Sequence, residues 1–193
     1  MTRRGSYAKG LAKREEILDA ALEVVAREGY RGTSVREISA ASGLSQAGLM
    51  HHFASKDELF TEILRRRDEV DTALISSDPD IRALEAFPLA IQHNTEVPGL
   101  VHLYVCFSAE ATAPQHTARA FFIERFARLQ NHLVEDIHAR QAAGELPVGL
   151  NAETAAGSLI ALADGLQTQW LLNPSIDMVA HIRHSIEGWR KQK

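Results

Sequence analysis

The chain has only one cysteine, Cys106, among its 193 residues, so it cannot form an internal disulfide. It has no apolar run of about 18 residues, which excludes the sequence pattern of a membrane-spanning helix. Its basic start, MTRRGSYAKG, is not followed by an apolar stretch and so differs from a secretory signal. Strand-like alternation, internal repeats and low-complexity stretches are also missing. We expect a cytoplasmic, all-helical protein in which Cys106 is a buried small hydrophobe.

Acidic side chains outnumber basic ones, 25 to 21, which gives a formal net charge of −4. The excess is uneven, because residues 1–67 carry 12 basic and 9 acidic side chains whereas residues 68–193 carry 9 and 16. A basic first part on an acidic remainder is typical of a phosphate-facing domain joined to a separate body, although many solvated faces differ by as much.

Residues 33–60, TSVREISAASGLSQAGLMHHFASKDELF, contain the signals for two short helices and the start of a third. Ser34 and Glu37 stand three residues apart, which predicts a capping box at the start of a helix over about 34–41. Gly43 follows where a turn with positive φ favours glycine.

Ser45 predicts the N-cap of a second short helix over about 45–52, and Ser55 with Glu58 predicts another capping box. Two short helices separated by such a tight turn have the spacing of a helix-turn-helix. The second helix of that motif enters the major groove of DNA.

Residues 13–60 resemble the DNA-binding domain of the TetR family of transcriptional regulators. The resemblance rests on three segments in the family's order and spacing, residues 32–38, 41–45 and 49–59. It implies an all-α protein with a three-helix DNA-binding domain over residues 11–71, in which the helix-turn-helix covers about 34–53. Residues 72–193 would then form a helical bundle for effector binding and dimerisation.

Gln46 is the expected base reader, because its amide can both donate to and accept from an adenine edge. Ala47 and Gly48 allow close approach, and Ala47 can touch a thymine methyl group. We expect phosphate contacts from the helix start, the recognition helix and the lysine after it, which are Thr33, Ser34, His51, His52 and Lys56. Arg36 is expected to contact DNA as well. A surface ion pair is the alternative for Arg36.

Met50 stands on this surface where the family usually has tyrosine. A thioether cannot donate a hydrogen bond, so one contact to the DNA backbone is expected to be missing. Affinity should then depend more on His52, on Lys56 and on a basic N-terminal arm, for which a disordered tail is the alternative. The basic residues of this arm are Arg3, Arg4 and Lys9.

Helical periodicity and breaks predict further helices over about 12–28, 56–76, 80–95, 99–111, 117–143, 151–172 and 176–190. Pro88 should kink or split one of them, and residues 77–79 should form a hinge. Arg65, Arg66 and Arg67 are expected on a solvated face.

The resemblance implies a homodimer on a near-palindromic operator, paired through the helices over about 117–143 and 151–172. Their candidate interface residues are Phe122, Leu129, Leu133, Leu159 and Leu166, with ordinary core as the alternative for each. It also implies a pocket for a small-molecule effector, with the candidates Phe87, His93, His102, Tyr104, Phe107 and Trp170. Ordinary core is again the alternative.

We expect a ligand-responsive repressor that is not an enzyme and carries no cofactor or metal. An activator or a protein-binding module on the same fold is the first alternative. An all-α enzyme is the second, but the sequence has no Glu-x-x-His motif, nucleophile elbow or phosphate loop. His181 and His184 have the spacing of a metal-binding pair, without further ligands nearby in the sequence.

Overall fold

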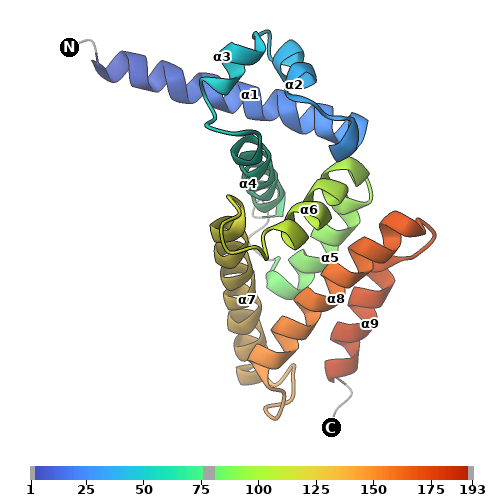
Figure 1. Ribbon diagram of the computed structural model, residues 1–193. Coiled ribbons are helices and arrows are strands. Elements are labelled where there is room, and N and C mark those ends of the chain that lie inside the picture. The colour runs from blue at the N-terminus through green and yellow to red at the C-terminus, as the bar shows by residue number, and fades with distance from the viewer. Residues whose placement is uncertain (1–2, 76–80, 191–193) are drawn as a thin grey trace. The chain divides into compact units, whose positions relative to one another are not determined.

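The computed structural model describes the backbone of residues 3–75 and 81–190 and the side chains of residues 10–72 and 81–190. Within these residues it is all-helical, as predicted, with nine helices and no strand (Figure 1). The helices are α1 (Arg3–Gly32), α2 (Val35–Ala41), α3 (Gln46–Met50), α4 (Lys56–Ile75), α5 (Ala83–Asn94), α6 (Pro98–Glu110), α7 (Arg119–Ala142), α8 (Ala152–Leu172) and α9 (Met178–Arg190). In the same residues no helix has both the length and the apolar character needed to cross a lipid bilayer.

Helix α1 differs most from its predicted bounds, because it begins at Arg3 rather than near residue 12. Gly29, directly after the predicted end at residue 28, interrupts the helical backbone with a φ of 73°. The side chains of the proposed basic arm lie outside the described residues, as does the predicted hinge at 77–79. Pro88 is buried inside α5 and does not split it.

The chain divides into two compact units. The first contains α1 to α3, α4 as far as Val70, and residues 97–119 with helix α6. The second contains α5, α7, α8 and α9. The domain boundary predicted at residues 71 and 72 stays a prediction, but α6 belongs to the unit that holds the helix-turn-helix, which the sequence alone does not indicate.

Helix α6 is seated directly on the backbone of α1. A Cβ atom added to Gly99 would lie 2.0 Å from the carbonyl oxygen of Val25 and 3.0 Å from that of Ala26. Gly29 Cα would also lie 3.0 Å away. Only a residue without a side chain permits so close an approach of two helices.

An aromatic cluster fills the first unit near this contact. The ring of Tyr30 in α1 packs edge-on against Phe60 of α4 and Phe107 of α6, with centroid distances of 5.4 and 5.6 Å. Burial raises the pKa of the Tyr30 hydroxyl. Two predictions are corrected here: Cys106 is half-buried rather than buried, and Arg67 is buried although a solvated face was expected.

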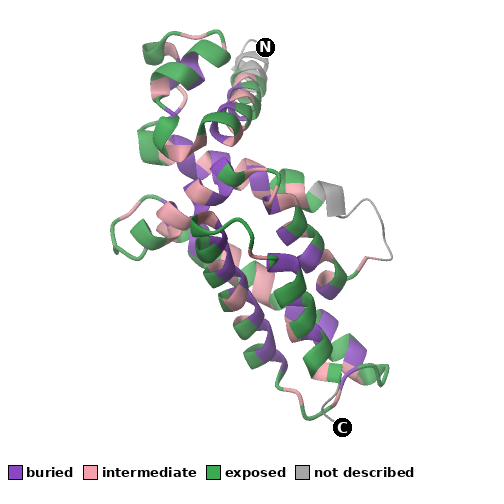
Figure 2. Cartoon of the chain, turned by 90° about the vertical axis from the view of Figure 1, so that its right-hand side faces the viewer, coloured by how far each residue is buried: buried purple, intermediate pink, exposed green. Residues whose placement is uncertain are grey.

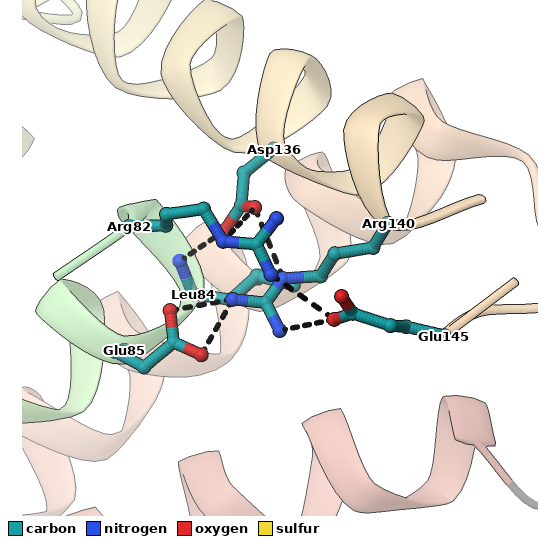
Figure 3. A network of polar contacts seen from close by, with 6 residues as sticks. All are labelled: Arg82, Leu84, Glu85, Asp136, Arg140 and Glu145. Atoms are coloured by element: carbon teal, nitrogen blue, oxygen red, sulfur yellow. Dashed lines mark hydrogen bonds and ion pairs between the residues drawn. The ribbon is translucent and has the colours of Figure 1, made fainter. Parts of the chain in front are cut away.

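In the second unit α9 packs against α5 and α8, and buried residues follow one side of each helix (Figure 2). A buried ion network joins α7 to the start of α5 (Figure 3). Asp136 and Arg140 lie one turn apart on α7, with 4% and 3% of their side chains exposed, and bond at 3.0 Å. Asp136 also accepts from the backbone N–H of Leu84 at 2.9 Å, a group that the first turn of α5 leaves unpaired.

Arg140 extends the network to both oxygens of Glu85, each at 2.5 Å, and to Glu145 at 3.2 Å. The more exposed Arg82 meets two of the same carboxylates, Asp136 at 3.5 Å and Glu145 at 3.0 Å. Burial alone would lower the pKa of Arg140, but the hydrogen bonds with Glu85 and Asp136 outweigh it and raise this pKa.

Candidate nucleic-acid interface

Helix α2 begins with the capping box that the sequence predicts. Ser34 Oγ accepts from the Glu37 N–H at 3.3 Å, and the Ser34 N–H donates to the Glu37 carboxylate at 2.6 Å. The Ser34 hydroxyl also donates to the same carboxylate at 2.9 Å, and the hydrogen bonds that this carboxylate accepts from the backbone N–H and the hydroxyl of Ser34 lower the pKa of Glu37. The box fixes the start of α2 with two bonds between neighbours in the sequence.

Replacing Ser34 with alanine is expected to lower the free energy of unfolding by about 1 kcal/mol, because the helix loses its N-cap. Glu37→Gln should reduce the loss in free energy of unfolding that the wild type shows as the pH becomes acidic. A carboxyl whose pKa is lowered by folding stabilises the fold above its ordinary value of 4.5, and this contribution disappears as the pH falls through the folded value. Urea titrations at neutral and acidic pH test both variants. Identical pH dependence in wild type and Glu37→Gln would contradict the second expectation.

The turn between α2 and α3 depends on Gly43, whose φ is 68° as predicted. It lets the N–H of Leu44 return to the carbonyl of Ser39 at 2.8 Å. Ser45 then caps α3 by accepting from the N–H of Gly48 at 3.0 Å, which confirms the predicted N-cap. The helix-turn-helix is therefore built as expected, with a recognition helix shorter than the predicted range of 45–52.

Leu49 is fully buried and sets which side of α3 faces outward. At about 100° per residue, Ala47 and His51 lie nearly opposite Leu49. Both are exposed, whereas Gly48 and Met50, on the flanks, are half-buried. A Cβ on Gly48 would lie 3.2 Å from Ser45 Oγ, so glycine keeps the cap undisturbed.

The other predicted contact residues differ in exposure. Ser34, Arg36, Gln46 and Lys56 are exposed, and His52 is half-buried. Thr33 is buried and its hydroxyl donates to the carbonyl of Gly29 at 2.8 Å, so this geometry does not favour the predicted hydroxyl contact with phosphate.

The start of α4 differs from its predicted capping box. Ser55 Oγ accepts from the Glu58 N–H at 3.0 Å, as expected. The Glu58 carboxylate, however, accepts from the N–H of Ala54 at 2.6 Å rather than from that of Ser55. It is also bonded to Arg14 of α1 at 3.2 Å, which draws it away from a purely local cap. Lys56 is the first residue of α4, and its Nζ lies 5.3 Å from the centre of the Phe60 ring.

Arg14 is a residue of this region that the sequence reasoning missed. Its guanidinium contacts the carbonyl of His52, the ring of Phe53 and the carboxylates of Glu58 and Glu62. Nothing local in the sequence marks these contacts, because the partners lie 38 or more residues away.

The six candidate effector residues are divided between the two units. His102, Tyr104 and Phe107 belong to the first, and Phe87, His93 and Trp170 belong to the second. All are buried except the half-buried His93 and His102. The pocket stays a prediction.

The candidate dimer residues are mostly core within one chain. Phe122, Leu133, Leu159 and Leu166 are buried, and only Leu129 is half-buried. Their part in an interface stays a prediction, and apart from Leu129 the accessible surface of these helices consists mainly of other side chains.

Comparisons with known proteins agree with the geometry of the helix-turn-helix. Residues 17–63 match the family model for bacterial regulatory proteins of the tetR family, and residues 82–189 match that for the C-terminal part of BetI-type transcriptional repressors. A relative from Agrobacterium fabrum, the HTH-type transcriptional regulator BetI, is 28% identical over 182 residues, which cover 91% of this chain and 78% of that protein.

Solved structures share the fold. A putative TetR-family regulator from Rhodococcus sp. has a TM-score of 0.75 at 23% identity, over 93% of this chain and 100% of that one. A putative transcriptional regulator from Saccharomonospora viridis, solved in complex with choline, has a TM-score of 0.69 at 24% identity, over 93% and 96%. The second family model alone covers more than half of the chain. This protein therefore belongs to the TetR family and is a DNA-binding transcriptional regulator.

Proposed function

We propose that the protein is a homodimeric, cytoplasmic repressor that binds a near-palindromic operator and is released from it by a small molecule. The observation that carries this proposal is the outward face of α3, where Ala47 and His51 lie opposite the buried Leu49 and Gln46 is exposed beside them. A helix held this way can enter a major groove without disturbing the core.

The chemistry of this face assigns roles to its residues. Gln46 would read an adenine, and the methyl group of Ala47 would rest against a thymine. His51, Arg36 and Lys56 would neutralise phosphates and supply the salt-dependent part of the affinity. Met50 would contribute apolar contact alone, because its sulfur donates no hydrogen bond.

Gln46→Ala is expected to weaken binding to the preferred duplex by about tenfold and to relax specificity at one base pair, the effect of losing a bidentate base contact. Lys56→Ala is the matched control, because a lost phosphate contact weakens all sequences alike and lowers the salt slope by about 0.9. Anisotropy titrations of both variants on the preferred and on unrelated duplexes separate the two effects. A uniform loss in Gln46→Ala would contradict the base-reading role.

Dimerisation follows from the small size of one reading helix, since a half-site of a few base pairs gives little specificity. The helices predicted to form the dimer interface are α7 and α8. The exposed side of α8 offers mainly small side chains, Ser158, Ala161, Gly165 and Thr168, followed by Leu172, which is 84% exposed. Small side chains let two helices approach closely. A second copy of the chain would cover this face.

Effector binding is proposed for the C-terminal part, which matches the BetI-type repressor model. Choline is the first compound to try, since the structural relative from S. viridis was solved with it. The proposal concerns ligand-controlled DNA binding and includes no catalytic step.

The decisive experiment is an anisotropy titration of the full chain on the DNA immediately upstream of its own gene, at two salt concentrations, with unrelated DNA as the control. Two protomers should bind per site, more tightly than to the control, and a working effector should release them. A protein that binds both DNAs alike, or binds as a monomer, would contradict the proposed function.

A further inference from the structure

Helix α3 depends on the rest of the unit for its orientation. It has only five residues, and so short a helix has little stability of its own. Its carbonyl groups at Ala47 and Leu49 accept from the N–H groups of His51 and His52, directly after the helix ends. The buried Leu49 determines which side of α3 faces outward, and groups that hold its two ends can fix the direction of the helix axis.

Ser45 holds the beginning of α3, and Arg14 holds the segment just after its end. Arg14 Nη1 donates to the carbonyl oxygen of His52, two residues beyond Met50. The guanidinium carbon also lies over the Phe53 ring, 4.3 Å from its centre, which is a cation–π contact. Two consecutive residues at the exit of the recognition helix are thus fixed by one side chain from α1.

The other edge of the guanidinium is bonded to α4. Arg14 Nη2 lies 3.2 Å from Glu58 Oε1 and 3.5 Å from Glu62 Oε2. The second oxygen of Glu58 accepts from the N–H of Ala54 at 2.6 Å. Arg14 therefore holds the carbonyl of His52, and Glu58, whose carboxylate Arg14 orients, holds the N–H of Ala54.

This arrangement does not favour a direct DNA contact by Arg14. Both of its terminal nitrogens are used within the protein, and its guanidinium carbon lies over the Phe53 ring. Two carboxylates stand beside its single positive charge and reduce its attraction for phosphate.

We propose that Arg14 is a positioning residue for DNA reading, which sets the direction of α3 by joining α1, the exit of the recognition helix and the start of α4. The inference rests on the proposed reading of bases by α3. It adds a specificity-determining residue that lies outside the helix-turn-helix and touches no base.

Arg66 offers a matched control. It also joins α4 to α1, bonding to Asp19 at 2.8 Å and to Glu15 at 3.1 Å. None of its bonds described here reaches α3 or residues 52–54. Removing Arg66 therefore tests the loss of an α1–α4 ion pair without loss of the contact at His52.

The experiment compares the full-length wild type, Arg14→Ala, Arg14→Lys and Arg66→Ala on a duplex that the wild type enriches from a randomised pool, and on unrelated DNA. Arg14→Ala should lose about tenfold in affinity for the enriched duplex, the scale of one lost base contact, with little change on unrelated DNA. Its salt slope should stay that of the wild type. The affinity of Arg14→Lys for the enriched duplex should lie between those of the wild type and Arg14→Ala. Lysine keeps the positive charge but lacks the planar guanidinium with its two terminal nitrogens. Arg66→Ala should bind both DNAs like the wild type.

Three results of the binding experiment would overturn the inference. A salt slope lowered by about 0.9 in Arg14→Ala would mean that Arg14 contacts a phosphate itself. Equal losses in Arg14→Ala and Arg66→Ala would mean that its role is only structural. Equal loss on both DNAs would mean that no orientation for reading is involved.

Hydrogen exchange of the free proteins keeps this test separate from that of the proposed function. Amides from residue 49 to residue 54 should exchange faster in Arg14→Ala than in Arg66→Ala. If the wild type enriches no sequence, the proposed base reading by α3 fails, and exchange alone then decides whether Arg14 holds the exit of the helix. Unchanged exchange would overturn that role as well. Arg14→Lys also serves if the alanine variant does not fold.

Discussion

Gly99→Ala is expected to lower the free energy of unfolding by about 3 kcal/mol or more, the upper range of overpacking costs. The new methyl group would lie 2.0 Å from the carbonyl oxygen of Val25, which is backbone and cannot turn aside as a side chain could. Helix α6 would have to leave α1, or α1 would have to bend near Gly29. Either change exposes part of the aromatic cluster of Tyr30, Phe60 and Phe107.

Urea unfolding followed by circular dichroism measures this loss. Gly10→Ala is the control, because it adds the same methyl group to α1 at an exposed position where, apart from its chain neighbours and the nearby backbone of its own helix, no atom lies within 4 Å. That variant should be as stable as the wild type or slightly more so, since alanine favours a helix over glycine. A Gly99→Ala protein with wild-type stability would show that the two helices are not in backbone contact.

The parts of the site that were predictable from sequence are those made by neighbours in the chain. The Ser34–Glu37 capping box, the positive φ of Gly43 and the Ser45 cap each need partners no more than a few residues away. The exposed face of α3 follows from the position of one buried residue, Leu49. Such local features are specified by residue type and spacing alone.

The features that were missed depend on partners far away in the sequence. The capping box expected at Ser55 was only half right, because Arg14 lies beside Glu58 in the folded chain. Arg67 was expected on a solvated face and is buried. Helix α6 belongs to the same unit as α1, and the two helices can pack this closely because Gly99 has no side chain. In the sequence, Gly99 indicates a helix break and not a packing site.

The helical periodicity of apolar residues also does not reveal whether an apolar face is buried within the chain or by a partner subunit. Leu133 and Leu159 have the spacing of a helix that buries one face, and both are buried within the chain itself. A partner subunit would produce the same spacing. The small exposed residues of α8, such as Ala161 and Gly165, carry no comparable signal, because alanine and glycine are common on any helix.

Arg140→Met is expected to lower the free energy of unfolding by about 3–5 kcal/mol, the cost of removing one partner from a buried ion network. Methionine retains much of the buried volume, so the loss comes mainly from the charge. Asp136, which is 4% exposed, would keep the Leu84 N–H and the more distant Arg82. The carboxylate that holds the start of α5 would then be poorly compensated.

Arg82→Ala is the matched control, because Arg82 contacts Asp136 and Glu145 as Arg140 does but has 41% of its side chain exposed. Solvent screens such a pair, so its removal should cost about 0–1 kcal/mol. Urea titrations of the two variants should therefore differ several-fold in lost stability, although both break ion pairs with the same carboxylates. Equal losses would mean that burial of Arg140 does not decide the strength of the network. The contact between α7 and the start of α5 would then be stabilised by apolar packing and not by these charges.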